Sequence, residues 1–101
     1  MRKLGLIGGL SWVSTAMYYE AINKGVAKRA GGLSSAPLII ESMDFAPVAA
    51  MQAAGEWGRL GELMAASARR LEEAGAGGVL ICSNTMHKLH EPGAGAVVGP
   101  V

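Results

Sequence analysis

The only cysteine of the chain, Cys82, stands where an apolar run ends and a series of hydrogen-bonding side chains begins, within the sequence LICSNTMHKLHE. Residues 78–81 precede it, and Ser83, Asn84 and Thr85 follow it. If a helix begins at these following residues, its free N–H groups and its dipole lower the pKa of the thiol from a reference value of about 8.5. Such a thiol can act as a nucleophile or as a general base. The alternative is a small buried hydrophobe at the end of a strand, because free cysteine is among the most buried residue types.

The three residues after Cys82 offer more hydrogen-bonding groups than one helix cap requires. A cap uses a single hydroxyl or amide side chain, whereas Ser83, Asn84 and Thr85 supply three. The excess suggests donors for an anionic ligand such as a carboxylate, as at helix N-termini that bind anions. Capping alone remains the other interpretation.

Neither a nucleotide site nor a metal site is predicted. The sequence GLIGG near the amino end lacks the G-x-G-x-x-G pattern of dinucleotide-binding proteins, and a tight turn explains its glycines. His87 and His90 lie three residues apart and suggest zinc binding together with Cys82. No second cysteine or pair of carboxylates completes a ligand set, so we expect no metal. We expect one histidine to pack near the start of a helix and the other to be exposed.

Three apolar stretches alternate with helical patterns along the chain. The strands are predicted at residues 4–7, 38–42 and 78–82, and the helices at residues 11 or 14 to 29, 44–51, 56–74, and 84 or 85 to 91. Apolar strands that alternate with helices indicate a parallel sheet covered on both faces. We therefore predict an α/β fold, a doubly wound three-layer sandwich with a mainly parallel sheet. Residues 1–91 form the predicted domain, and residues 92–101 form an irregular tail rich in glycine and proline.

The polar groups of interest follow the predicted strands. The loops GGLSW, SMDF and CSNTMH each come directly after one strand. Because crossover connections in a parallel sheet are right-handed, these loops are expected to meet at the carboxyl edge. Ligands of open α/β sheets bind at that edge. The sequence therefore predicts a binding site there.

Composition excludes several classes of protein. Half of the 101 residues are hydrophobic and 17% are charged, with a mean hydropathy of +0.30, which is typical of a globular domain. Nine basic and eight acidic residues, spread along the chain, do not indicate a nucleic-acid partner. The amino-terminal sequence reads as neither a signal peptide nor a membrane span, and a lone cysteine forms no internal disulfide. We therefore predict a cytoplasmic protein with no membrane partner.

The chain resembles the aspartate/glutamate racemase family, the cofactor-independent amino-acid racemases, over about residues 3 to 89. The matching segments are GLIGGLSWVSTAMYYEAIN, AGGLSSAPLIIESMDFAPV, GEWGRLGELMAASARRLEEAGA and CSNTMHK. The resemblance implies a flavodoxin-like half of a two-domain fold, with the amino acid between the domains and one catalytic cysteine from each. One cysteine removes the α-proton and the other delivers a proton to the opposite face. No pyridoxal phosphate or other cofactor is implied.

The resemblance also assigns roles to individual residues. Cys82 matches one of the two acid/base cysteines. Leu10 stands where the family commonly has a methionine beside the substrate, and Gln52 matches a glutamine that contacts the substrate. The segment Ser83-Asn84-Thr85 matches a carboxylate-binding segment that is usually Thr-Asn-Thr.

The chain departs from the family in its single cysteine and in stopping before a second domain. We therefore expect a truncated member with little or no turnover alone, or one that works with another polypeptide. A homo-oligomer or a second racemase-like domain is the expected partner, and a small amino acid the expected substrate. The alternative is a non-catalytic homologue that binds a small carboxylate or a full-length relative. A third hypothesis is a thiol hydrolase with His87 as its base.

Overall fold

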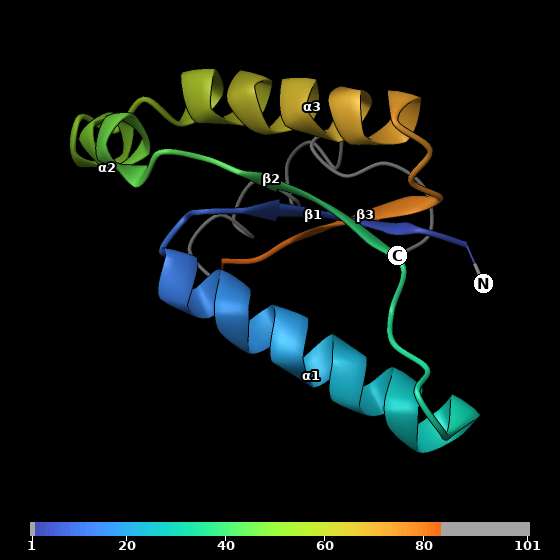
Figure 1. Ribbon diagram of the computed structural model, residues 1–101. Helices are drawn as coiled ribbons and strands as arrows, with labels where there is room; N and C mark the ends of the chain where they lie inside the picture. The colour runs from blue at the N-terminus through green and yellow to red at the C-terminus, as the bar shows by residue number, and fades with distance from the viewer. Residues whose placement is uncertain (1, 84–101) are drawn as a thin grey trace.

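The computed structural model describes residues 2–83, which form a three-stranded sheet between helices (Figure 1). The elements in chain order are β1 (Leu4–Gly8), α1 (Trp12–Ala30), β2 (Leu38–Ser42), α2 (Phe45–Ala53), α3 (Trp57–Glu73) and β3 (Gly78–Ile81). The predicted alternation of strands and helices is confirmed over these residues, although β3 ends one residue before the predicted end. The predicted last helix, the domain boundary at residue 91 and the tail lie outside the described residues.

The sheet is parallel throughout, with strand order β2-β1-β3. Leu4 of β1 is aligned with Leu38 of β2 and with Gly78 of β3, so the three strands begin level with one another. This order is the beginning of the flavodoxin-like arrangement. α1 covers one face, and α3 covers the other with α2 beside its amino end (Figure 1). The predicted α/β fold, doubly wound with three layers, is therefore confirmed.

The main hydrophobic core lies between the sheet and α3. Alternate strand residues face this helix. In β1, Ile7 is fully buried, and a Cβ added to Gly5 would lie only 3.0–3.1 Å from Ala76 and Leu71. The facing residues of α3 recur at three- and four-residue spacing, as the sequence predicts: Leu60, Met64, Ala68 and Leu71. Because each fully buried aliphatic side chain contributes about 1.5–3 kcal/mol, this layer carries much of the stability of the fold.

The layer under α1 is covered less completely. Thr15 is the buried residue of this helix, all of which lies in the described part of the chain. Ile22 and Val26, which follow Thr15 at helical spacing, are half-buried, whereas Tyr19 is 49% exposed. Trp12, in the first turn, is 74% exposed. Within residues 2–83, α1 is the helix on this face, and apolar side chains here are in contact with solvent.

Local sequence signals fix the ends of α2. Asp44 caps the helix by accepting a hydrogen bond from the N–H of Ala46 at 3.1 Å, as the sequence predicts. At the other end, the N–H of Glu56 donates to the carbonyl of Met51 at 2.9 Å across Gly55, which has a φ of +71°. This is the Schellman arrangement, in which a glycine in the left-handed conformation ends a helix. The helices predicted at residues 44–51 and 56–74 are thus two separate elements, with Gly55 between them.

Candidate functional site

Backbone hydrogen bonds join the three loops at the carboxyl edge of the sheet. The N–H of Cys82, just beyond β3, donates to the carbonyl of Ile7 at 3.0 Å. The N–H of Met43, just beyond β2, donates to the carbonyl of Gly8 at 2.8 Å. The end of β1 is therefore hydrogen-bonded to the residues that follow β2 and β3. The predicted meeting of the three loops is confirmed for their described residues.

The loop after β1 packs against the loop after β2 without space for a side chain between them. Gly9 has a φ of +79°, a left-handed conformation that favours glycine. A Cβ at this position would overlap the backbone nitrogen and carbonyl oxygen of Met43. Gly8 is also closely packed, because an added Cβ would lie 2.6 Å from Cγ2 of Thr15. The glycines of the predicted tight turn therefore also permit close contact between two loops.

Thr15 ties the first turn of α1 to the same loop. Its Oγ1 accepts a hydrogen bond from the N–H of Gly9 at 2.8 Å and donates to the carbonyl of Ser11 at 3.4 Å. Ser11 occupies the N-cap position with a φ of +82°, and its side chain makes no capping hydrogen bond. A positive φ outside glycine costs about 1–3 kcal/mol and persists where the surroundings hold it. The buried hydroxyl of Thr15 is therefore part of what fixes this turn.

Cys82 is fully buried, and burial raises the pKa of its thiol from 9.0 to about 11. This direction is opposite to the lowered pKa that the sequence predicts. The predicted lowering requires a helix that begins directly after Cys82, and residues from 84 onward lie outside the described part of the chain. The pKa rises because the buried thiol has lost contact with water, which disfavours the charged thiolate. Because the helix that would lower the pKa lies outside the described residues, the reactive thiolate stays a prediction.

Leu10 and Gln52 occupy different surroundings. Leu10 is 3% exposed and belongs to the hydrophobic core with Ile7 and Val48, so its side chain packs beneath the carboxyl edge. Gln52 is half-buried near the end of α2, the helix that follows the β2 loop. Their contacts with a substrate remain predictions.

Of the residues after Cys82, the structure describes Ser83 alone. Ser83 is buried beside the thiol-bearing residue. Asn84 and Thr85, predicted to bind a carboxylate, lie outside the described residues, and so do His87 and His90. Within residues 2–83, no group of three His, Cys, Asp or Glu side chains could hold a metal ion. No helix in that part of the chain has the length and apolar character to cross a membrane.

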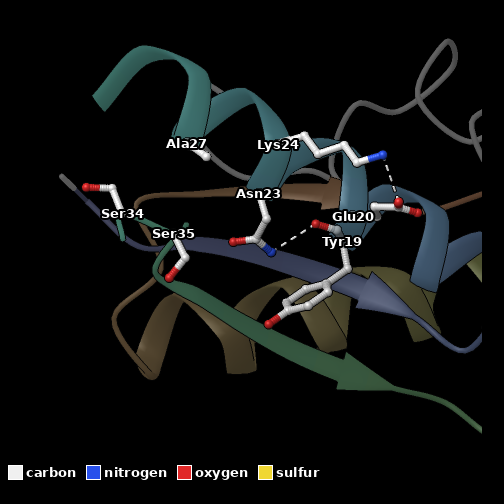
Figure 2. A pocket seen from close by; sticks show the side chains of 7 residues that line it. All are labelled: Tyr19, Glu20, Asn23, Lys24, Ala27, Ser34 and Ser35. Atoms are coloured by element: carbon white, nitrogen blue, oxygen red, sulfur yellow. Dashed lines mark hydrogen bonds and ion pairs between the residues drawn. The ribbon is translucent and has the colours of Figure 1, made fainter. Parts of the chain in front are cut away.

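Within residues 2–83, two cavities lie beside β2 or the loop that leads into it, and the described residues that line them include no predicted site residue. One, of about 490 Å³, lies between α1 and the loop that leads into β2 (Figure 2). Its lining includes Tyr19, Asn23 and Ser35. The other, of about 260 Å³, lies beside the end of β2 and is lined by residues that include Glu41 and Arg70. This second cavity also borders Met43, in the loop after β2 that is joined to the end of β1.

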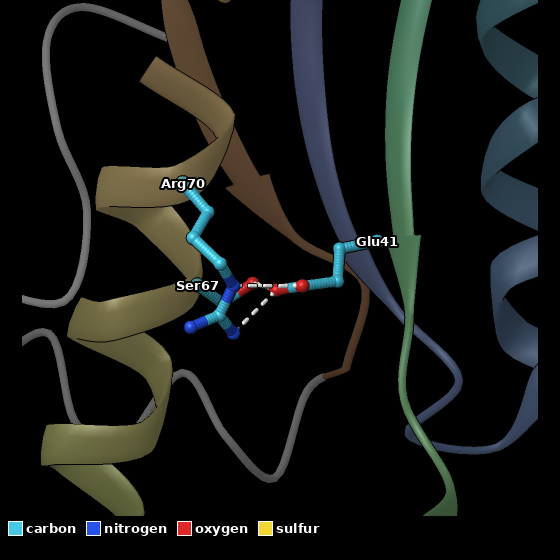
Figure 3. A network of polar contacts seen from close by, with 3 residues as sticks. All are labelled: Glu41, Ser67 and Arg70. Atoms are coloured by element: carbon cyan, nitrogen blue, oxygen red, sulfur yellow. Dashed lines mark hydrogen bonds and ion pairs between the residues drawn. The ribbon is translucent and has the colours of Figure 1, made fainter. Parts of the chain in front are cut away.

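A polar network that the sequence analysis did not identify fixes β2 to α3 (Figure 3). Arg70 donates two hydrogen bonds to the carboxylate of Glu41, at 2.9 and 2.8 Å, and the buried hydroxyl of Ser67 donates a third. The hydrogen bond from Arg70 lowers the pKa of the Glu41 carboxyl. The sequence contains one signal for this network. Glu41 shares a strand face with Ile39, which packs on the core, so a charge at this position requires a partner.

These features define a class of protein: an α/β domain of flavodoxin-like strand order with a thiol where its third strand ends. A family model described as Asp/Glu/Hydantoin racemase matches residues 7–101. The chain belongs to the Asp/Glu/hydantoin racemase family. The resemblance found in the sequence is confirmed.

Two solved structures are similar to the chain. A provisionally assigned Asp/Glu racemase from Yersinia pestis is 45% identical with a TM-score of 0.86, over 90% of this chain and 40% of that chain. An aspartate racemase homologue from Pyrococcus horikoshii is 28% identical with a TM-score of 0.79, over 99% of this chain and 43% of that chain. The chain therefore spans less than half the length of either structure.

Proposed function

We propose that this chain supplies one of the two acid/base thiols, and part of the binding surface, of a cofactor-independent amino-acid racemase. The observation that carries the proposal is the position of Cys82, whose N–H bonds to the carbonyl of Ile7 where the parallel strands end. Ligands of open parallel sheets bind at this edge. Membership of the racemase family supports the type of reaction.

The burial of Cys82 suits the proton-donating role. With a pKa of about 11 the thiol is protonated at neutral pH, so its resting form can deliver a proton. A base on the opposite face removes the α-proton, Cys82 gives its proton to the carbanion, and a thiolate remains on Cys82. In the reverse direction this thiolate removes the α-proton of the other enantiomer. A single thiol that removes and returns the proton on one face regenerates the starting enantiomer.

The remaining site residues hold the amino acid in this proposal. Ser83, Asn84 and Thr85 donate hydrogen bonds to its carboxylate, which gains negative charge as the α-proton leaves. Gln52 contacts the substrate from α2. Leu10 lies beneath it, in keeping with its burial in the core. The second thiol comes from another racemase-like domain or from a second copy of the chain.

Exchange of the α-proton tests this proposal. The chain is incubated in D₂O with each enantiomer of aspartate and glutamate, and loss of the Cα–H signal is followed by NMR. We expect exchange without inversion in one enantiomer, at a rate that rises with pH toward about 11 as the thiolate forms. Cys82→Ala should abolish it. Ile81→Val, which shortens a buried neighbour and keeps the sulfur, is the matched control. Exchange that survives in Cys82→Ala would contradict the role of the thiol.

A binding function without catalysis is the second candidate. The complete burial of Cys82 favours it, because a buried thiol reaches a substrate less easily than an exposed one. In this case an amino acid or a small dicarboxylate would raise the melting temperature of wild type and of Cys82→Ala equally. Such stabilisation, with no exchange at any pH, would select this candidate over the first.

A further inference from the structure

Trp12 lies in the first turn of α1, where this helix begins beside the carboxyl edge of the sheet (Figure 1). One turn further on, the hydroxyl of Thr15 accepts a hydrogen bond from the N–H of Gly9, so Thr15 is level with the end of β1. Residues three apart on a helix lie on the same side, and their side chains tilt toward the helix N-terminus. Trp12 therefore stands on the sheet side of α1, beyond the end of β1. Its exposure of 74% agrees with this position.

Other apolar side chains border the same edge. Leu10 is buried beneath it, and Met43, in the loop after β2, is half-buried against the core. Phe45, the first residue of α2, is 39% exposed. Apolar surface gains free energy when it is covered by another apolar group. The carboxyl edge therefore suits a ligand with an apolar part.

The charge that the described residues place at this edge is negative. Asp44, in the loop after β2, has an exposed side chain that caps α2. At the start of α3, Glu56 and Arg59 form an ion pair at 2.9 Å and balance one another. The other basic residues between positions 2 and 83 lie before β1 or in the second halves of α1 and α3, toward the opposite edge: Arg2, Lys3, Lys24, Lys28, Arg29, Arg69 and Arg70. A carboxylate on the side chain of a ligand would therefore meet a like charge here.

We propose that Trp12 contacts the side chain of the bound amino acid, and that this chain favours amino acids with uncharged, apolar side chains over aspartate and glutamate. This inference rests on the proposed function, which holds the α-carboxylate beside Cys82. The side chain of the amino acid then lies against the rest of the edge, where the indole of Trp12 covers it and Asp44 disfavours a second carboxylate. Aspartate binds at the same place, but more weakly.

Three amino acids of similar size separate the apolar and the charge contributions. The L-enantiomers of leucine, asparagine and aspartate are titrated into the ¹⁵N-labelled chain, and dissociation constants are taken from the amide signals of Leu10 and Ser83. We expect leucine to bind at least about fivefold more tightly than asparagine, because the indole removes its side chain from water. Asparagine should bind about twofold more tightly than aspartate, because Asp44 repels the added charge. Aspartate that binds as tightly as leucine would overturn the proposal.

Matched variants assign each difference to one side chain. Trp12→Ala should remove most of the advantage of leucine, whereas Met17→Ala, on the side of α1 opposite Thr15 and 66% exposed, should keep it. Asp44→Asn, which retains a capping side chain, should bring aspartate close to asparagine. Glu72→Gln removes a negative charge at the far end of α3 and should leave their ratio unchanged. An advantage of leucine that survives Trp12→Ala would overturn the role of the indole.

The indole N–H signal of Trp12 separates failure of this inference from failure of the proposed function. Leucine should shift this signal and leave unchanged that of Trp57, which packs against the core from α3. Shifts at Leu10 and Ser83 without a shift at the indole of Trp12 would overturn the inference and leave the proposed function intact. No shift at any of these positions, with leucine or with aspartate, would overturn both.

Discussion

Replacement of Gly9 by alanine tests how closely the loops of the candidate site are packed. A Cβ at Gly9 would enter the space that the backbone of Met43 occupies. That backbone cannot move away without lengthening the 2.8 Å hydrogen bond from the N–H of Met43 to the carbonyl of Gly8. We therefore expect Gly9→Ala to separate the loops that follow β1 and β2.

The expected loss of stability has three sources. Alanine in a left-handed conformation costs about 1–2 kcal/mol. Overpacking against a fixed backbone adds about 1–3 kcal/mol. A weakened backbone hydrogen bond adds about 1 kcal/mol. The total, about 3–6 kcal/mol, is a large part of the roughly 5–15 kcal/mol by which a domain is usually stable.

Gly55→Ala is the matched control for this substitution. Gly55 has a similar φ of +71°, but no atom lies within 4 Å of an added Cβ, so only the conformational cost of about 1–2 kcal/mol applies. Urea unfolding followed by circular dichroism measures both variants. The free energy of unfolding should fall by at least about 2 kcal/mol more in Gly9→Ala than in Gly55→Ala. Equal losses would refute the close contact between the loops.

Three further predictions concern the side chains of Thr15, Glu41 and Cys82. Thr15→Val leaves the N–H of Gly9 without its acceptor and should cost about 1–3 kcal/mol in urea unfolding, whereas Thr15→Ser, which keeps the hydroxyl, should cost less. The pKa of Glu41 is lowered in the folded state, so its stabilising effect is complete above pH 4.5 and is lost as the pH falls through the folded pKa. The difference in the free energy of unfolding between wild type and Glu41→Gln should therefore shrink in acid. A constant difference would count against the bond to Arg70. The pKa of Cys82 is raised from 9.0 to about 11, so the contribution of the thiol to stability is complete below pH 9 and is lost as the pH rises toward 11. Over this range the free energy of unfolding of wild type should fall by about 2–3 kcal/mol relative to that of Cys82→Ala. No relative fall would contradict the burial of the thiol.

Local patterns in the sequence suffice to predict most of the fold. A pattern of a few residues indicates each element, such as the spacing of Leu60, Met64 and Leu71 in α3 or the capping position of Asp44. The alternation of apolar strands with helices then predicts the parallel sheet, because this layered arrangement buries both of its faces. The exposure of Tyr19 does not follow from such patterns, since it depends on how much of the sheet α1 covers.

The candidate site is predictable only in part. The meeting of the three loops follows from parallel strands, which end at one edge. The bond between Gly9 and Thr15 and the contact of Glu41 with Ser67 depend on packing between elements, which no short pattern contains. The pKa of Cys82 illustrates the same limit. The neighbouring residues favour a lowered value, but the complete burial of the side chain raises it.

The proposed function requires that an amino acid binds at the carboxyl edge beside Cys82. An NMR titration of the ¹⁵N-labelled chain with aspartate and with glutamate tests this claim most directly. Binding at this edge should produce saturable shifts in the amide signals of Leu10 and Ser83, with those of Ser34 and Ser35 in the cavity beside α1 unchanged. Shifts confined to Ser34 and Ser35, or no shift at the carboxyl edge, would contradict it.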